Sequence, residues 1–115
     1  MGWELIYYQT ADGECPVRKF LDELPKPHRA KVFAAISLLQ EREPSLGFPH
    51  TSQVEGRIRE LRAHYGRQLY RILYFMDSQR RVVLLEAFEK DTAKVPLGRL
   101  RTATNRLQGH VTREE

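Results

Sequence analysis

Residues 57–90 constrain the fold more than any other stretch, because they read as three consecutive strands joined by two tight turns. The turn candidates lie at 65–68 and 77–80, and the runs around them are rich in Leu, Ile, Val, Tyr and Phe. Alternating apolar and polar positions bounded by turn residues are typical of a β-meander. The sequence therefore predicts an antiparallel sheet, and the rest of the chain is expected to support it.

The positions of the two turns predict which residues of neighbouring strands face each other. A turn centred on 66–67 places Arg62 directly opposite Arg71. A turn centred on 78–79 places Arg71 opposite Glu86. Three charged side chains would then converge in the middle of the sheet.

The same register predicts the composition of the two faces, because side chains alternate along a strand. One face would be apolar and is expected to be the core face: Leu61, Ala63, Tyr70, Ile72, Tyr74, Val83, Leu85 and Ala87. The other would mix charged and apolar side chains: Glu60, Arg62, His64, Arg71 and Glu86 among Leu69, Leu73, Phe75, Leu84 and Phe88.

The segments outside the meander predict one strand and three helices. A β-branched and aromatic run at 3–9 should be a strand, and amphipathic helices opened by proline should cover 16–24 and run from 27 to about 42. The Pro- and Gly-containing stretch 43–56 is predicted to be a loop. A last helix should begin at Pro96 and end at Gly109, followed by a frayed tail.

These elements give the order β-α-α-β-β-β-α, an α/β (α+β) chain with its helices packed on one face of the sheet. A chain of 115 residues is long enough for one core, so residues 1–115 are expected to form a single domain. The start of the chain does not resemble a signal peptide, and no apolar run is long enough to span a membrane. We therefore expect a cytoplasmic protein without a membrane partner, in which the single Cys15 forms no internal disulfide.

Charge is distributed unevenly along the chain. Residues 1–56 hold six Lys or Arg against eight Asp or Glu, whereas residues 57–106 hold twelve against five. The basic part contains the meander. Segregated positive charge of this kind suggests a polyanionic partner such as a nucleic acid.

Two arginines directly opposite each other need an explanation, because like charges in that position destabilise a sheet by up to about 1 kcal/mol. One hypothesis is a structural cluster in which Glu86, with Glu60 as a second candidate, neutralises the pair. The other is an anion site, in which two forked guanidinium groups bind one phosphate. The residues alone leave both hypotheses open.

Several common catalytic motifs are absent from the sequence. It has no Gly-rich phosphate loop, no GxSxG elbow, no HExxH motif and no cluster of Asp or Glu suited to Mg²⁺. We therefore expect no metal site and no cofactor.

Three groups of residues resemble motifs of the RelE/HigB superfamily of toxins, and most closely its phage-derived HigB-like branch. They are Glu60-Leu61-Arg62, the run 69–74 (LYRILY), and Phe88-Glu89-Lys90 followed by Thr92, Lys94 and Pro96. The order and spacing of the elements extend the resemblance over nearly the whole chain. It implies a compact domain with a mainly antiparallel four-stranded sheet, in which the opening strand lies beside the last strand.

The resemblance also implies a function and partners. It implies the toxin component of a type II toxin-antitoxin system, a messenger-RNA interferase that cleaves on the translating ribosome and inhibits translation. The partners would be messenger RNA on the ribosome and a cognate HigA-like antitoxin with a helix-turn-helix domain. Operator DNA would be bound only through the antitoxin.

Residue by residue, Arg71 matches the arginine that contacts the scissile phosphate in this superfamily, and Arg62 matches the arginine of the ELR motif. Lys90 matches the first lysine of a common F-x-K-K ending. Asp91 departs from that ending, because many relatives have a second basic residue there.

The chemistry of metal-free RNA cleavage agrees with the arginine pair. The 2′-OH attacks the adjacent phosphorus, so the protein must neutralise the phosphate, accept one proton and donate another. Arg62 and Arg71 would neutralise charge, since arginine stays protonated. Lys90, His64 and Glu86 are the candidate acids or bases, and the sequence does not choose among them. Five further basic residues are expected to contact the RNA backbone: Arg57, Arg59, Lys94, Arg99 and Arg101.

Two other functions are compatible with the same residues. A catalytically decayed member, altered at Asp91, would bind the antitoxin as a corepressor or act as an RNA-binding module. A plain interaction domain would use Arg62, Arg71 and Glu86 as a structural triad only.

Overall fold

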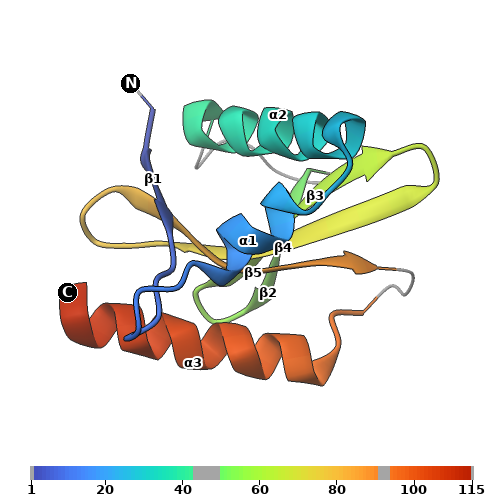
Figure 1. Ribbon diagram of the computed structural model, residues 1–115. Coiled ribbons are helices and arrows are strands. Elements are labelled where there is room, and N and C mark those ends of the chain that lie inside the picture. Colours follow the sequence, from blue (N-terminus) through green and yellow to red (C-terminus); the bar gives the residue numbers. More distant parts are fainter. Residues whose placement is uncertain (1, 43–49, 91–93, 115) are drawn as a thin grey trace.

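The computed structural model describes residues 2–42, 50–90 and 94–114, with the side chain of Lys90 left out (Figure 1). Within these residues the chain forms five strands and three helices: β1 (Glu4–Tyr7), α1 (Pro16–Asp22), α2 (Lys26–Arg42), β2 (Thr51–Glu55), β3 (Ile58–Tyr65), β4 (Gln68–Met76), β5 (Arg81–Lys90) and α3 (Leu97–Glu114). The predicted α+β class is confirmed. None of the helices in the described ranges has the length and apolar character needed to cross a membrane.

The strands form a single sheet in the order β1-β5-β4-β3-β2. The predicted meander is confirmed as β3, β4 and β5, which pair antiparallel, and β1 lies beside β5 in parallel. The prediction of four strands is wrong, because β2 forms within the stretch predicted to be a loop. This short strand lies at the edge of the sheet and pairs only with β3. It can therefore form without an alternating apolar pattern that the sequence would reveal.

The helices cover both faces of the sheet (Figure 1). On one face α1 and α2 pack against a core of Leu61, Ala63, Tyr70, Ile72, Tyr74, Val82, Leu84 and Ala87. On the other, α3 contributes Ala103 and Leu107 to a core with Ile58, Leu73, Phe75, Val83, Leu85 and Phe88. The prediction of helices on one face is therefore wrong. The central strands carry apolar side chains on both faces, and both faces must be shielded from water by helices.

The connection between β4 and β5 differs from the predicted two-residue turn. Asp77 N donates to Arg81 O, and Arg80 between them adopts a left-handed backbone conformation with φ of 61°. Three residues thus form the loop. The register then slips once more within β5, because Leu73 faces Glu86 while Tyr74 faces Leu84.

This second slip leaves Leu85 as an additional residue in β5, a β-bulge. Arg71 consequently faces Phe88, so the prediction that it faces Glu86 is wrong. Between the loop and the bulge the faces are exchanged relative to the prediction: Val83 and Leu85 point toward α3, and Leu84 toward α1 and α2.

The last helix continues through Gly109 to Glu114, so the predicted end at Gly109 and the frayed tail are wrong. A Cβ atom at Gly109 would lie 3.1 Å from the hydroxyl oxygen of Tyr8. Glycine therefore permits close contact with the segment after β1 rather than ending the helix. Arg113 holds the same contact by donating to Gln9 O at 2.8 Å.

Candidate functional site

The two predicted arginines lie side by side on neighbouring strands. Arg62 of β3 pairs directly with Arg71 of β4, which confirms the predicted register. The register follows from the tight turn at Gly66, whose φ of 62° suits glycine, and from the pairing of Tyr65 with Gln68 that closes the hairpin. By strand alternation both arginines point to the face that α3 covers.

Glu60 lies between the two guanidinium groups and binds both. Its Oε1 accepts from Arg62 Nη2 at 2.9 Å, and its Oε2 accepts from Arg71 Nη1 at 2.8 Å. Arg62 Nη2 also donates to Ser52 Oγ of β2 at 2.8 Å. One carboxylate thus offsets the repulsion between two positive charges and leaves the cluster with a net charge of about +1.

The cluster is largely buried but borders a pocket. The exposed fraction of the side chain is 3% for Glu60, 7% for Arg71 and 21% for Arg62. The neighbouring cavity has a volume of about 270 Å³ and is lined by Ser52, Gln53, Val54, Glu60, Arg62, Arg71, Lys94, Val95 and Leu100. It has a charged and polar wall from the sheet and an apolar wall that includes the first turns of α3.

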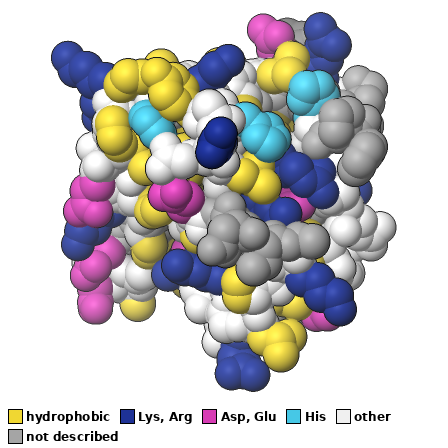
Figure 2. Space-filling view, turned by 90° about the vertical axis from the view of Figure 1, so that its right-hand side faces the viewer, with side chains coloured by type: hydrophobic (Ala, Val, Ile, Leu, Met, Phe, Trp, Pro, Cys, Tyr) yellow, Lys and Arg dark blue, Asp and Glu magenta, His cyan; other side chains and the backbone are white. Residues whose placement is uncertain are grey.

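The pocket belongs to the basic end of the molecule. Figure 2 looks at the end where the β3–β4 hairpin, the last residues of β5 and the start of α3 come together, and Lys and Arg side chains gather there. Lys94, which is exposed, joins the arginine pair in lining the pocket. Positive charge around a recess of this kind favours an anionic ligand.

Glu86 is not a partner of the arginine pair. Its carboxylate instead binds two arginines of α3, with Arg99 Nη1 and Arg106 Nη1 each at 3.3 Å. Arg106 Nη1 also donates to Leu85 O at 2.7 Å, next to the bulge. The hypothesis that Glu86 neutralises Arg62 and Arg71 is therefore wrong, and Glu60, the second candidate, has that position.

His64 lies close to the pair on the same strand. It follows Arg62 by two residues, so its side chain points to the same face, and it is exposed. The register places His64 opposite Leu69, which in turn faces Lys90. The side chain of Lys90 and all of Asp91 lie outside the described residues, so their contributions to the site stay predictions.

The predicted RNA-contacting residues fall into two groups. Lys94, Arg99 and Arg101 lie just before α3 or in its first half, and all three are exposed. Arg99 also lies over the ring of Phe88, at 5.1 Å from its centroid. Lys94 lines the pocket, and Arg99 and Arg101 lie on either side in sequence of Leu100, the α3 residue that lines it.

Arg57 and Arg59 lie elsewhere. Arg57, in the β2–β3 turn, donates to Met76 O at 3.0 Å and covers the ring of Phe75. Arg59 points to the opposite face of the sheet from Arg62, where its Nε lies 3.3 Å from the hydroxyl of Tyr74. The structure does not bring these two together with the arginine pair.

Sequence reasoning missed the contribution of β2. Ser52, Gln53 and Val54 line the pocket, yet this short polar strand gave no recognisable pattern. The position of Glu60 beside Arg62 could be predicted, because residues two positions apart on a strand point to the same face of the sheet.

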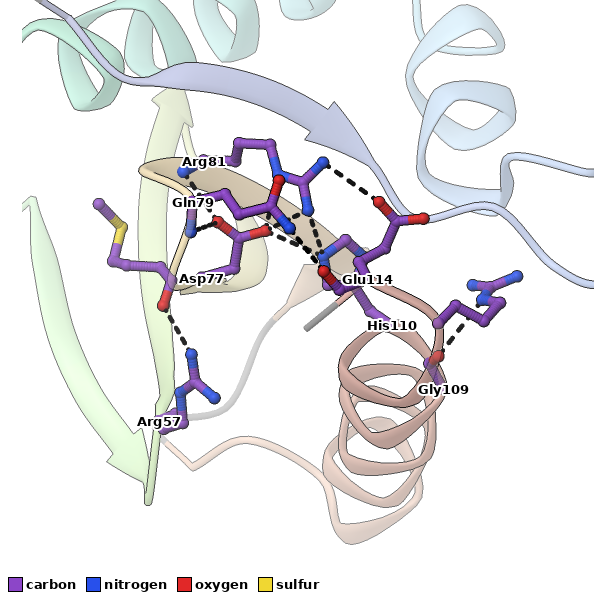
Figure 3. A network of polar contacts seen from close by, with 9 residues as sticks. Arg57, Asp77, Gln79, Arg81, Gly109, His110 and Glu114 are labelled. Carbon is purple, nitrogen blue, oxygen red and sulfur yellow. Dashed lines mark hydrogen bonds and ion pairs between the residues drawn. The ribbon is translucent and has the colours of Figure 1, made fainter.

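A second polar network lies at the other end of α3 (Figure 3). Asp77 Oδ2 lies 2.7 Å from Arg81 Nε and 3.0 Å from His110 Nε2, while its Oδ1 accepts from the backbone N–H groups of Gln79 and Arg81. Burial raises the pKa of Asp77, but these hydrogen bonds outweigh it and the net effect lowers the pKa. Arg81 Nη1 extends the network to Glu114 at 3.3 Å.

Among the described residues, no group of three or more His, Cys, Asp or Glu is arranged to hold a metal ion.

Comparisons with known proteins assign a family. Residues 19–108 match the family described as phage-derived protein Gp49-like. A Mycobacterium tuberculosis protein named as the toxin HigB2 is 36% identical over 95 residues, which cover 78% of this chain and 44% of the relative. Two proteins of the same species, named as endoribonuclease HigB1, are 32% identical over 106 residues, or 92% of this chain and 82% of each relative.

The chain thus spans less than half of HigB2 and most of HigB1. The family match extends from α1 into the second half of α3 and includes both strands that carry the arginine pair. The chain therefore belongs to the phage-derived Gp49-like family, within the HigB-like branch of the RelE/HigB superfamily that its strand motifs indicated.

Proposed function

We propose that this chain is the toxin of a type II toxin-antitoxin system and an endoribonuclease that cleaves messenger RNA on the ribosome, thereby inhibiting translation. The observation that carries the proposal is the pair of arginines, Arg62 and Arg71, at the wall of a pocket in the basic end of the molecule. The names of the relatives, toxin HigB2 and endoribonuclease HigB1, support it.

The proposed reaction needs no metal ion. The 2′-oxygen of a ribose attacks the adjacent phosphorus, the bond from phosphorus to the 5′-oxygen breaks, and a 2′,3′-cyclic phosphate forms. One proton leaves the 2′-OH and one reaches the 5′-oxygen. Arg62 and Arg71 would bind the non-bridging oxygens, where a preorganised donor can lower the barrier by roughly 3 to 4 kcal/mol.

The proton transfers need groups other than arginine, which stays protonated. Among the described candidates, His64 is exposed and shares the face of Arg62, whereas Glu86 is bound to two arginines of α3. An imidazole can both accept and donate a proton near neutral pH. We assign one proton transfer to His64 and keep Lys90 as the other candidate.

The RNA strand on either side of the scissile phosphate would follow the basic residues of the same end. Lys94 lines the pocket, and Arg99 and Arg101 continue along α3. Their contacts with phosphates would be strongly salt-dependent. In this proposal the ribosome holds the messenger RNA in place, so the chain itself need supply only the groups that act on the phosphate.

The proposal includes partners. A cognate antitoxin, HigA-like and with a helix-turn-helix domain, would block the activity and carry the complex to operator DNA. The chain would act in the cytoplasm, without a cofactor and without a membrane.

The experiment compares Arg71→Lys with the wild type in messenger-RNA cleavage on purified ribosome complexes, read by primer extension. Lysine keeps the charge and can still reach Glu60, but it loses the planar fork of donors. We expect a loss of cleavage rate of about 10²- to 10³-fold. The matched control is Arg80→Lys, an exposed arginine in the β4–β5 turn, which should leave the rate unchanged.

Either of two results would decide against parts of the proposal. A folded Arg71→Lys variant that cleaves like the wild type removes Arg71 from the reaction. A wild-type chain that produces no new 5′ ends in translated messages rejects the nuclease activity and favours the corepressor alternative.

A further inference from the structure

We propose that Glu60 is a positioning residue, which fixes the two guanidinium groups of the pair at the spacing that one phosphate requires. The catalytic consequence of this inference rests on the proposed nuclease function. The geometric part does not, because it concerns only the order of the arginine side chains.

We call the arrangement in which Glu60 binds both Arg62 and Arg71 the clamp. Each carboxylate oxygen accepts from a different arginine, at 2.9 Å for Arg62 and 2.8 Å for Arg71. Charge-assisted hydrogen bonds of this length are among the stronger ones in proteins. Because both oxygens bind guanidinium groups, Glu60 is placed to hold the arginines rather than to accept a proton from RNA.

The sheet fixes the three residues in one frame. Glu60 and Arg62 are two positions apart on β3 and share a face, and Arg71 is the direct cross-strand neighbour of Arg62. Ser52 on the adjacent β2 also accepts a hydrogen bond from Arg62 Nη2, at 2.8 Å. The long arginine side chains are thereby ordered before any substrate arrives, so little further ordering is needed when a phosphate binds.

Burial strengthens this role. The side chain of Glu60 is 3% exposed, so water competes little with its two contacts. At the same time Glu60, Arg62 and Arg71 all line the pocket, so the ordered pair borders the space where a ligand would sit.

A second role, simple neutralisation of like charges, predicts a different result when the charge of Glu60 is removed. If Glu60 only neutralises, its loss makes the site more positive, and RNA should bind more tightly and be cleaved at least as fast. If Glu60 positions, binding should be kept or strengthened while the cleavage rate falls. A misplacement of about 1 Å at a reacting centre can reduce a rate by about 10²-fold.

The test uses Glu60→Gln in the full chain, with single-turnover cleavage on ribosome complexes and binding of a 2′-deoxy-substituted RNA that cannot react. We expect a rate loss of about 10²-fold with the dissociation constant unchanged or lower. The matched control is Glu89→Gln, which removes one exposed carboxylate from β5 and should leave the cleavage rate unchanged. Cleavage by Glu60→Gln at or above the wild-type rate overturns the proposal.

A second variant, Glu60→Asp, distinguishes the effect of carboxylate position from the effect of its charge. It also provides the test if Glu60→Gln does not fold. The shorter aspartate keeps the negative charge but cannot reach both arginines from the same backbone position. We expect slower cleavage in this variant as well. Full activity of Glu60→Asp would show that charge alone is required and would reject the clamp.

A readout independent of activity is the ¹⁵N NMR signal of the guanidinium groups. In the wild type, rotation of the Arg62 and Arg71 guanidinium groups should be slow, and in Glu60→Gln it should be fast for at least one of them. Unchanged rotation overturns the clamp even if the nuclease function holds. Slow rotation in a wild-type chain that does not cleave supports the clamp and rejects only the nuclease function.

Discussion

Glu60 and Asp77 are both buried carboxylates that bind arginine, yet they lie near opposite ends of α3 and differ in what surrounds them. Asp77 is enclosed: its side chain is 0% exposed, and its oxygens bind Arg81, His110 and two backbone N–H groups. Glu60 binds two arginines that border a pocket. Access for a ligand, rather than the length of the ion pairs, separates the two sites.

Glu86 is an intermediate case. Its carboxylate also binds two arginines, but these come from α3 and the contacts are longer, at 3.3 Å each. Arg99 is about half exposed, and Arg106 also binds the backbone of β5. Glu86 thus attaches α3 to the bulged strand, whereas Glu60 joins two strands within the sheet. The three carboxylates therefore differ in role: Asp77 stabilises the fold, Glu86 attaches α3 to β5, and Glu60, in our proposal, contributes to catalysis.

The strongest test of this comparison removes the enclosed carboxylate. Asp77→Ala leaves Arg81 and His110 without their buried partner, and we expect the free energy of unfolding in urea to fall by about 3 to 5 kcal/mol. Cleavage per folded molecule should stay at the wild-type level, because the network is far along α3 from the pocket. If Asp77→Ala is as stable as the wild type but cleaves more slowly, the Asp77 network serves cleavage rather than stability, which contradicts this comparison.

A smaller effect is expected from acid alone. The pKa of Asp77 is lowered in the folded protein, because hydrogen bonds from Arg81, His110 and the backbone outweigh the effect of burial. A lowered folded pKa means that the stabilisation is complete above the ordinary aspartate value of 3.8 and is lost as the pH falls through the folded value.

We therefore expect the unfolding free energy of the wild type to fall more steeply than that of Asp77→Asn when the pH is lowered below about 4. Chemical denaturation at a series of acidic pH values measures both slopes. Parallel slopes would show that Asp77 does not dominate acid unfolding.

The smallest effect is expected at Glu86. Glu86→Gln weakens two partly exposed ion pairs, and we expect a loss of about 1 kcal/mol in the free energy of unfolding. The cleavage rate should stay within about twofold of the wild type, or about 0.4 kcal/mol in the barrier, because Glu86 binds α3 and not the arginine pair. A large loss of cleavage would restore Glu86 as a candidate acid or base.

The meander and the arginine pair could be predicted because local signals fixed them. Gly66 supplies the left-handed residue that a tight hairpin turn requires, so the β3–β4 register followed from its position. No glycine marks the β4–β5 turn, where Arg80 adopts the left-handed conformation and the side chain of Asp77 binds the loop backbone. The wrong register there produced the wrong partner for Arg71.

Other features depend on tertiary contacts that a single sequence does not show. The β-bulge at Leu85 has no recognisable signal in the sequence, and together with the three-residue β4–β5 loop it decides which residues of β5 face α3. Strand β2 exists because β3 offers it an edge, and Gly109 lies within α3 because Tyr8 packs against it. The contact of Glu60 with Arg62 could be predicted from strand alternation alone, but Glu60 was only the second candidate because the wrong β4–β5 register favoured Glu86.

The parallel pairing of β1 with β5 also affects how the protein is made. Glu4 faces Arg81, so β1 has its partner only after α1, α2 and the meander that follows them have been synthesised. Pairings between such distant segments form late, since the intervening chain must first be closed into a loop. The β3–β4 hairpin that carries the arginine pair closes over only a few residues, so we expect the pair to form before β1 joins the sheet at its opposite edge.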